Sequence, residues 1–117
     1  MKTLLITLLL LASQGLQFNK TVHDFGTITV SDGPQTCEFT VTNTSEEPVS
    51  ILAVVSSCGC TDVQWPKESI PAGKQGKISV TYSNDDGPYP FDKVLTVYIS
   101  DEKKPVILHV KGVVKKK

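Results

Sequence analysis

Short runs in which apolar and polar residues alternate recur along the chain and are separated by Gly, Pro, Asn and Asp. Such alternation predicts β-strands with one buried face and one wet face. In residues 36–43, Cys37, Phe39 and Val41 alternate with Thr and Glu, so Cys37 is expected on the core side. No stretch keeps apolar residues at helical spacing for more than two turns, and the pattern therefore favours an all-β fold.

Strands are expected over residues 23–30, with a bend at Gly26, and over 36–43, 49–55, 61–65, 77–83, 93–100 and 106–114. The segment 49–55 is nearly all apolar, which predicts a central strand covered on both faces. The side chains expected to point inward from the last three strands are Ile78, Val80, Tyr82, Leu95, Val97, Ile99, Val106, Leu108 and Val110.

About seven short strands in about a hundred residues predict an immunoglobulin-like β-sandwich over residues 16–114. An antibody-type domain would carry a cysteine in its sixth strand and a tryptophan in its third. Here the sixth strand has no cysteine and Trp65 follows the third, which argues against the antibody subfamily but not against the sandwich.

The first residues differ from the rest in composition. Lys2 precedes an apolar run over residues 4–12, and Ser13-Gln14-Gly15 has the small residues of a cleavage site. This order is typical of a secretory signal peptide, here residues 1–15, and the run is too short for a membrane span. No cysteine stands at the cleavage point to be acylated. A periplasmic or secreted protein without a membrane span is therefore expected, starting near Leu16 and ending in a basic tail, residues 115–117.

The charge balance argues against nucleic acid as a partner. The chain has 12 basic and 12 acidic residues, and all the basic ones are lysines. Arginine is the residue best suited to holding phosphate with two parallel hydrogen bonds, so its absence also argues against an anion-binding active site.

Several short motifs spread over 18–113 together resemble the family called domain of unknown function 1573. They are His23-Asp24-Phe25-Gly26, Phe39-Thr40-Val41-Thr42-Asn43-Thr44, Ser57-Cys58-Gly59-Cys60-Thr61 with Trp65, Ile70-Pro71-Ala72-Gly73 and Val110-Lys111-Gly112-Val113. That bacterial family is similar to the ASPM/hydin and major-sperm-protein type of immunoglobulin-like domain. The resemblance implies an exported envelope protein with no established enzymatic activity. Ser100 and Cys37 depart from its usual pattern.

The spacing of Cys58 and Cys60 places both thiols on the same side of an extended segment, with Gly59 between them. Two converging sulfurs can pack or form a structural disulfide, hold copper or zinc, or cycle as a redox disulfide. His23 would complete a metal-ligand set if the first strand passed beside this bend. The structural interpretation is favoured because zinc sites usually have four recognisable ligands. Cys37 is expected to be an inert core thiol, with a bridge to Cys58 or Cys60 as the alternative.

The two histidines, His23 and His109, stand in no catalytic motif. His23 and Asp24 are neighbours on a strand and point to opposite faces, so they are expected to hydrogen-bond the bend at Gly26 rather than to act as a catalytic pair. Residues 84–87 are interpreted as a turn.

The sequence therefore predicts a non-enzymatic binding or structural module that engages unidentified protein partners. A soft-metal protein and a thiol-disulfide protein remain the alternatives, both depending on Cys58 and Cys60.

Overall fold

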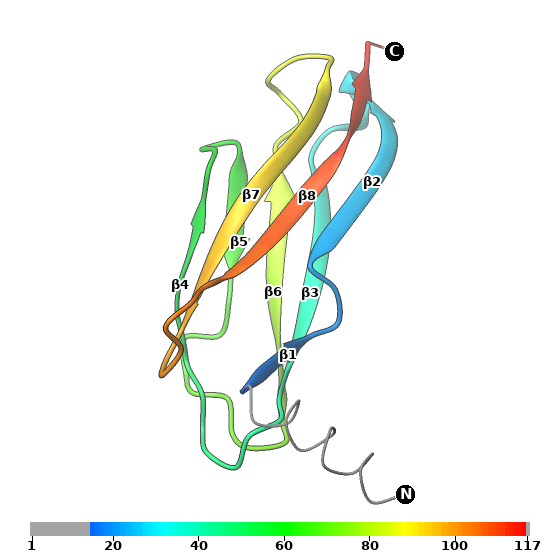
Figure 1. The fold of residues 1–117 in the computed structure, drawn as a ribbon. Coiled ribbons are helices and arrows are strands. Elements are labelled where there is room, and N and C mark those ends of the chain that lie inside the picture. Colours follow the sequence, from blue (N-terminus) through cyan, green and yellow to red (C-terminus); the bar gives the residue numbers. More distant parts are fainter. Residues whose placement is uncertain (1–14, 117) are drawn as a thin grey trace, which may run out of the picture.

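Two four-stranded β-sheets face each other in the computed structural model, which describes residues 15–116 (Figure 1). The first sheet has the order β1 (Leu16–Phe18), β3 (Gln35–Asn43), β6 (Gln75–Tyr82), β5 (Thr61–Gln64). The second has the order β2 (Val22–Thr29), β8 (Val106–Lys115), β7 (Pro90–Ile99), β4 (Ile51–Ser56). The expected immunoglobulin-like sandwich is thereby confirmed. The predicted signal peptide lies outside the described residues, apart from Gly15.

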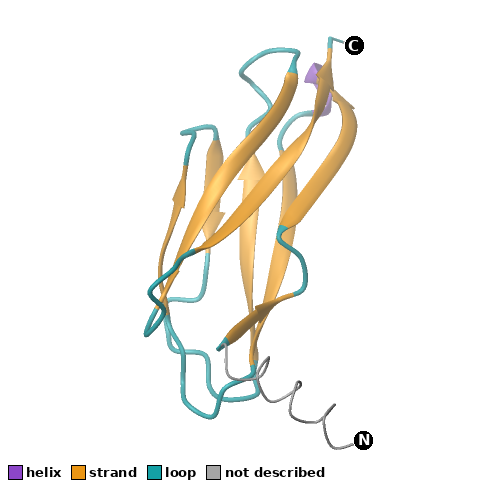
Figure 2. Cartoon of the chain, viewed as in Figure 1, coloured by secondary structure: helices purple, strands orange, loops and turns teal. Residues whose placement is uncertain are grey.

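The single helical turn of the described part is a 3-10 turn over Val30–Asp32, between β2 and β3 (Figure 2). No helix within residues 15–116 has the length and apolar character needed to cross a bilayer.

The core lies between the inward faces of the two sheets, as the alternation predicts. Cys37, Phe39 and Val41 are buried on β3, and Leu95 and Val97 oppose them from β7. Of the other residues expected to point inward, Val106 is only partly buried, while Ile78, Val80, Tyr82, Ile99, Leu108 and Val110 are buried. Burying one such side chain stabilises a fold by about 1.5–3 kcal/mol, so these rows hold the two sheets together.

Two features of the strand order differ from the prediction. Strand β1 was not expected, because three residues are too few for an alternation to show; it pairs antiparallel with β3 and buries Leu16. The expectation that 49–55 is a central strand covered on both faces is wrong. Strand β4 ends the order of its sheet, and Leu52 and Val55 are 63% and 52% exposed.

The bend at Gly26 fits β2 against β8. Gly26 has φ +75, and its N–H donates to Asp24 Oδ1 at 2.8 Å. The parallel pairing of β2 with β8 shifts register there, between Asp24 and Thr27. A Cβ on Gly112 of β8 would lie 2.9 Å from the Gly26 carbonyl oxygen, so this approach requires glycine.

A buried asparagine joins three segments at one end of the sandwich. Asn43, at the end of β3, has no exposed surface; its Nδ2 donates to the carbonyls of Glu47 and Ile70, each at 2.8 Å. Its Oδ1 accepts from the N–H and the hydroxyl of Ser45. The side chain therefore takes the place of a regular turn between β3 and β4.

Replacing this asparagine tests its role. Asn43→Ala removes the four hydrogen bonds of a buried side chain, and we expect the free energy of unfolding to fall by about 2–4 kcal/mol. The measurement is the urea midpoint at unchanged slope. The control is Asn19→Ala, which removes one exposed bond, from the N–H of Thr40, and should cost about 1 kcal/mol or less. Equal losses in the two variants would contradict the assignment.

Candidate functional site

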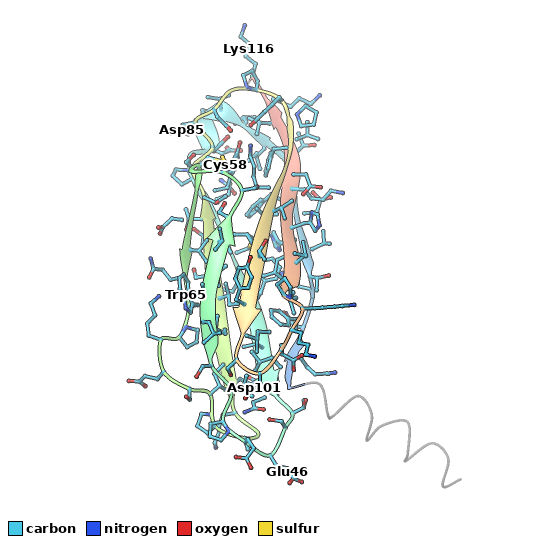
Figure 3. All side chains as sticks on the ribbon, turned by 60° about the vertical axis from the view of Figure 1, so that its left-hand side comes forward. Glu46, Cys58, Trp65, Asp85, Asp101 and Lys116 are labelled. Atoms are coloured by element: carbon cyan, nitrogen blue, oxygen red, sulfur yellow. A yellow bond between two sulfur atoms is a disulfide. The ribbon has the colours of Figure 1, made fainter. Side chains whose placement is uncertain are left out.

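The Cys-Gly-Cys segment forms the connection from β4 to β5 and so passes from the second sheet to the first. The connection from β6 to β7 passes back between the sheets at the same end, because β5 starts opposite the end of β6 with Thr61 paired to Tyr82. The N–H of Ser83 donates to the Cys60 carbonyl at 2.8 Å and ties the two connections together. Figure 3 shows Cys58 and Asp85 at this end of the molecule, with Asp101 and Glu46 at the other.

Hydroxyl groups fix the course of the Cys-Gly-Cys loop. Ser56 Oγ donates to the Cys58 carbonyl at 2.8 Å and accepts from the Cys58 N–H at 3.1 Å. Thr61 Oγ1 donates to the same carbonyl at 3.0 Å. Ser57 is bonded to Val94 of β7 through both its N–H and its hydroxyl. The small polar residues around the two cysteines therefore replace the strand ladder where the chain changes sheets.

The two sulfurs of the loop are joined. Cys58 and Cys60 form a disulfide with an S–S distance of 1.99 Å. Both residues are half-buried. Cys60 packs against a small aromatic cluster in which the rings of Tyr82 and Phe91 stack at 4.1 Å. The N–H of Cys60 donates to Cys58 Sγ at 3.1 Å.

A carboxylate lies beside this disulfide. The ligand atoms of Cys58, Cys60 and Asp86 all lie within 4.8 Å of one another. Asp86 Oδ1 accepts from the Tyr82 hydroxyl and Oδ2 from the Tyr89 hydroxyl, each at 2.5 Å. Lys93 Nζ lies 3.4 Å from Oδ2 and donates to the Tyr89 oxygen at 2.9 Å. The carboxylate is thus held in one orientation by Tyr82 at the end of β6, Tyr89 in the β6–β7 connection and Lys93 of β7.

These contacts set the charges of the group at neutral pH. Partial burial raises the pKa of Asp86, but the hydrogen bonds from Tyr82 and Tyr89 and the charge of Lys93 outweigh it, so this pKa lies below its ordinary value. Burial, followed by the hydrogen bond to Asp86, raises the pKa of Tyr82 well above its ordinary value. Asp86 is therefore ionised and Tyr82 remains a hydrogen-bond donor.

His23 is not a member of this group. Its ring packs edge-on against Phe25 with centroids 4.6 Å apart, and Lys20 Nζ lies 2.8 Å from its Nδ1. Burial, followed by the charge of Lys20, lowers the pKa of His23. Among the described residues, the group that could hold an ion with the two sulfurs contains Asp86 and not His23.

The remaining sequence-predicted residues are also placed by packing. Cys37 is buried on β3 and is the free thiol of the three cysteines. Trp65 packs against the main core, with Lys67 Nζ 3.5 Å from its ring centroid. His109 bonds Asp92 Oδ1 at 2.8 Å on the outer face of the second sheet.

Sequence reasoning missed Asp86, Tyr89 and Lys93 as parts of the site. Residues 84–87 have the composition of a turn, and no residue spacing links them to a Cys-Gly-Cys loop more than twenty positions earlier. Only the crossing of two connections at one end of the sandwich brings them together.

Three comparisons relate the chain to known proteins. The family model described as Protein of unknown function (DUF1573) matches residues 16–114, and no curated protein matches. A protein of unknown function from Porphyromonas gingivalis W83 is 13% identical with a TM-score of 0.70, over 85% of this chain and 46% of that one. The ASH/PapD-like domain 7 of human CEP192 is 11% identical with a TM-score of 0.67, over 91% and 89%.

The secreted serine protease VesC from Vibrio cholerae is 15% identical with a TM-score of 0.66, over 91% of this chain. The chain spans less than half of the Porphyromonas protein and only 24% of VesC. At these identities the likeness concerns the fold, which occurs as one domain of CEP192 and as one part of the longer VesC chain.

Alkylation kinetics distinguish the three cysteines. Burial raises the pKa of Cys37 to about 11, against a reference value of 9.0. We therefore expect iodoacetamide at pH 8 to modify Cys37 about 100-fold more slowly in the native protein than in the unfolded one. The rate should rise with pH as thiolate forms. After mild reduction, Cys58 and Cys60 should react quickly while Cys37 stays protected.

The readout is peptide mass spectrometry at successive times. One modified cysteine in the denatured, unreduced chain and three after reduction are expected. A disulfide-linked peptide containing Cys37, or equal native and denatured rates for its thiol, would contradict this assignment.

Proposed function

Because this chain belongs to the DUF1573 family, whose description assigns no function, we propose that it is a non-enzymatic binding module that engages a partner protein. The proposed contact is the outer face of the second sheet, formed by β8, β7 and β4 with the start of β2. The observation that carries the proposal is the difference in polarity between the two outer faces of the sandwich.

On the second sheet, cross-strand neighbours on the outer face form two rows. One row is Val55, Thr96 and Ile107, and the other is Val94, His109 and Val22. Val22, Val55 and Ile107 are 47%, 52% and 43% exposed, and Tyr98, next along β7, is 44% exposed. Together these side chains form an exposed apolar surface on a sheet face that usually carries polar residues.

The outer face of the first sheet provides the comparison within the same molecule. Its two corresponding rows are Thr36, Thr81 and Asp62, and Glu38, Ser79 and Gln64. None of these residues is apolar. Thr36 and Thr81 are hydrogen-bonded to each other, and Glu38 pairs with Lys77. This face has the ordinary character of a sheet surface in water.

The composition of strand β4 also supports a partner-binding surface on this outer face. Residues 49–55 have the composition of a strand covered on both faces, yet Leu52 and Val55 of β4 stand in solvent. A partner that packs an apolar surface against β4, β7 and β8 would supply the missing cover. Its chemistry is that of a protein surface with aliphatic and aromatic side chains at the centre and polar groups at the rim, to match Asp92 and Lys111.

The fold neighbours support the class of function, and the segment that resembles a signal peptide is the ground for the proposed compartment. The CEP192 chain is a PapD-like domain with a similar sandwich, which supports a domain-sized binding module. The family match and β1 both begin at residue 16, immediately after the segment that resembles a signal peptide. We place the module in the bacterial cell envelope on that basis.

Photo-crosslinking followed by reconstitution tests the proposed face. A benzoylphenylalanine at position 107 should form one reproducible protein adduct in producing cells, and the same residue at position 64 should not. The purified partner should then bind Val55→Lys/Ile107→Lys at least 10-fold more weakly than the unmodified protein, because the lysines bring charge into an apolar contact.

The matched control is Thr36→Lys/Gln64→Lys, which adds the same charges to the other outer face and should leave affinity unchanged. Equal binding by both double variants would overturn the proposal. So would adducts made only to lipid or only to a second copy of this chain, which analytical ultracentrifugation would detect as self-association.

A further inference from the structure

We propose that the reduced form of Cys58-Gly59-Cys60, together with Asp86, binds a zinc ion. The proposal concerns the end of the sandwich where the sheets exchange strands, and it does not depend on the apolar outer face.

The three ligand atoms already converge from two connections. Cys58 and Cys60 come from the β4–β5 loop and Asp86 from the β6–β7 loop, and their sulfur and oxygen atoms lie within 4.8 Å of one another. In a tetrahedral zinc site, bonds of about 2.0–2.3 Å put neighbouring ligand atoms about 3.3–3.8 Å apart. Once the S–S bond is broken, a shift that takes the two sulfurs from 1.99 Å to about 3.8 Å apart is needed to complete such a site.

The loop can make that shift without disturbing the core. Gly59 is exposed, and no atom lies within 4 Å of the place where its Cβ would be. Cys58 is only half-buried, whereas Cys60 is anchored against the aromatic cluster. Opening the disulfide therefore moves Cys58 and Gly59 through solvent while Cys60 and Asp86 keep their places.

The surrounding groups support metal ligation. The N–H of Cys60 points to Cys58 Sγ, where it stabilises a thiolate. Tyr82 and Tyr89 hold the Asp86 carboxylate by one hydrogen bond to each oxygen, and Oδ1, which Lys93 does not pair with, keeps a lone pair for a cation. Two thiolates and one carboxylate carry three negative charges, which a divalent ion and the neighbouring Lys93 ammonium neutralise.

The donor set selects zinc over copper. Copper(I) is soft and is satisfied by thiolates alone, whereas zinc accepts thiolate and carboxylate oxygen together. Asp86 is the feature that favours zinc, and a water molecule would take the fourth position.

Ion binding requires reduction first. A dithiol reductant gives two electrons to the Cys58–Cys60 bond; the S–S bond breaks, each sulfur takes a proton, and the reductant leaves as its own disulfide. Zinc then displaces the two thiol protons into solvent and forms two Zn–S bonds. The oxidised loop offers no thiolate, so this site exists only in the reduced protein.

Metal titration of the full processed chain tests the proposal. The protein is reduced with dithiothreitol, freed of reductant without oxygen, and titrated with zinc against a chromophoric chelator. Cobalt(II) gives a second readout through its sulfur-to-metal charge-transfer absorption. We expect one ion for each reduced chain and at least 100-fold weaker binding by the oxidised protein. Asp86→Asn, which keeps the shape of the side chain, should weaken zinc at least 10-fold.

Two controls accompany the titration. Asp85→Asn alters the adjacent carboxylate, which bonds the Ser83 hydroxyl and lies outside the group, and Cys37→Ser removes the buried thiol; both should bind zinc like the unmodified protein. Asp86→His supplies another zinc ligand at the same place and should restore binding if Asp86→Asn merely lost a donor. Thermal unfolding of each variant shows whether it is folded.

The proposal is overturned if the reduced protein binds zinc no more tightly than Cys58→Ser/Cys60→Ser does. It is equally overturned if folded Asp86→Asn retains full affinity, or if loss of Cys37 abolishes binding.

Discussion

The structure of this domain depends on one interaction, the packing of the inward-facing apolar side chains of one sheet against those of the other. Neither sheet has another apolar layer against its inner face, so β3 and β6 must stack on β7 and β8. Because successive strands β4 and β5 lie in different sheets, and so do β6 and β7, the chain has to cross the sandwich between them. These crossings carry the Cys58–Cys60 disulfide and Asp86 to one place. The site is therefore a product of the packing, and the buried Tyr82 connects it to the core through its hydrogen bond to Asp86.

The sequence predicted those parts of the structure that follow from local alternation. Eight of the nine residues predicted to point inward from β6, β7 and β8 have no exposed surface or nearly none, as their positions in the pattern require. Strand β1 escaped prediction because three residues make no pattern. Strand β4 was predicted to be a central strand covered on both faces, but it lies at the edge of its sheet. A strand buried on both faces and a strand with an exposed apolar face have the same composition, so the sequence does not distinguish them. Alternation tells which side chains share a face, but it does not tell what lies over that face.

The candidate site was predictable only in part, for a different reason. The spacing of Cys58 and Cys60 brings two sulfurs to one side within a single loop, and that much is local. Asp86 reaches them from a connection formed much later in the chain, and the contact depends on Thr61 standing opposite Tyr82. His23 was predicted as the third ligand because histidine is a common metal ligand, but its side chain contacts Phe25 and Lys20 instead. A contact between loops of two sheets requires the register of the strands, which no motif contains.

The parallel pairing of β2 with β8 gives the domain a mechanical property. Strand β2, near the start of the domain, and strand β8, at its end, run in the same direction along the long axis (Figure 1). Tension that pulls the start of β2 away from the end of β8 therefore slides one strand along the other. All the hydrogen bonds between them then bear the load together, instead of opening one after another as they would if the strands were peeled apart. The glycines at 26 and 112 let the two backbones approach closely enough to resist that sliding. A module with this arrangement transmits tension along its length before it unravels.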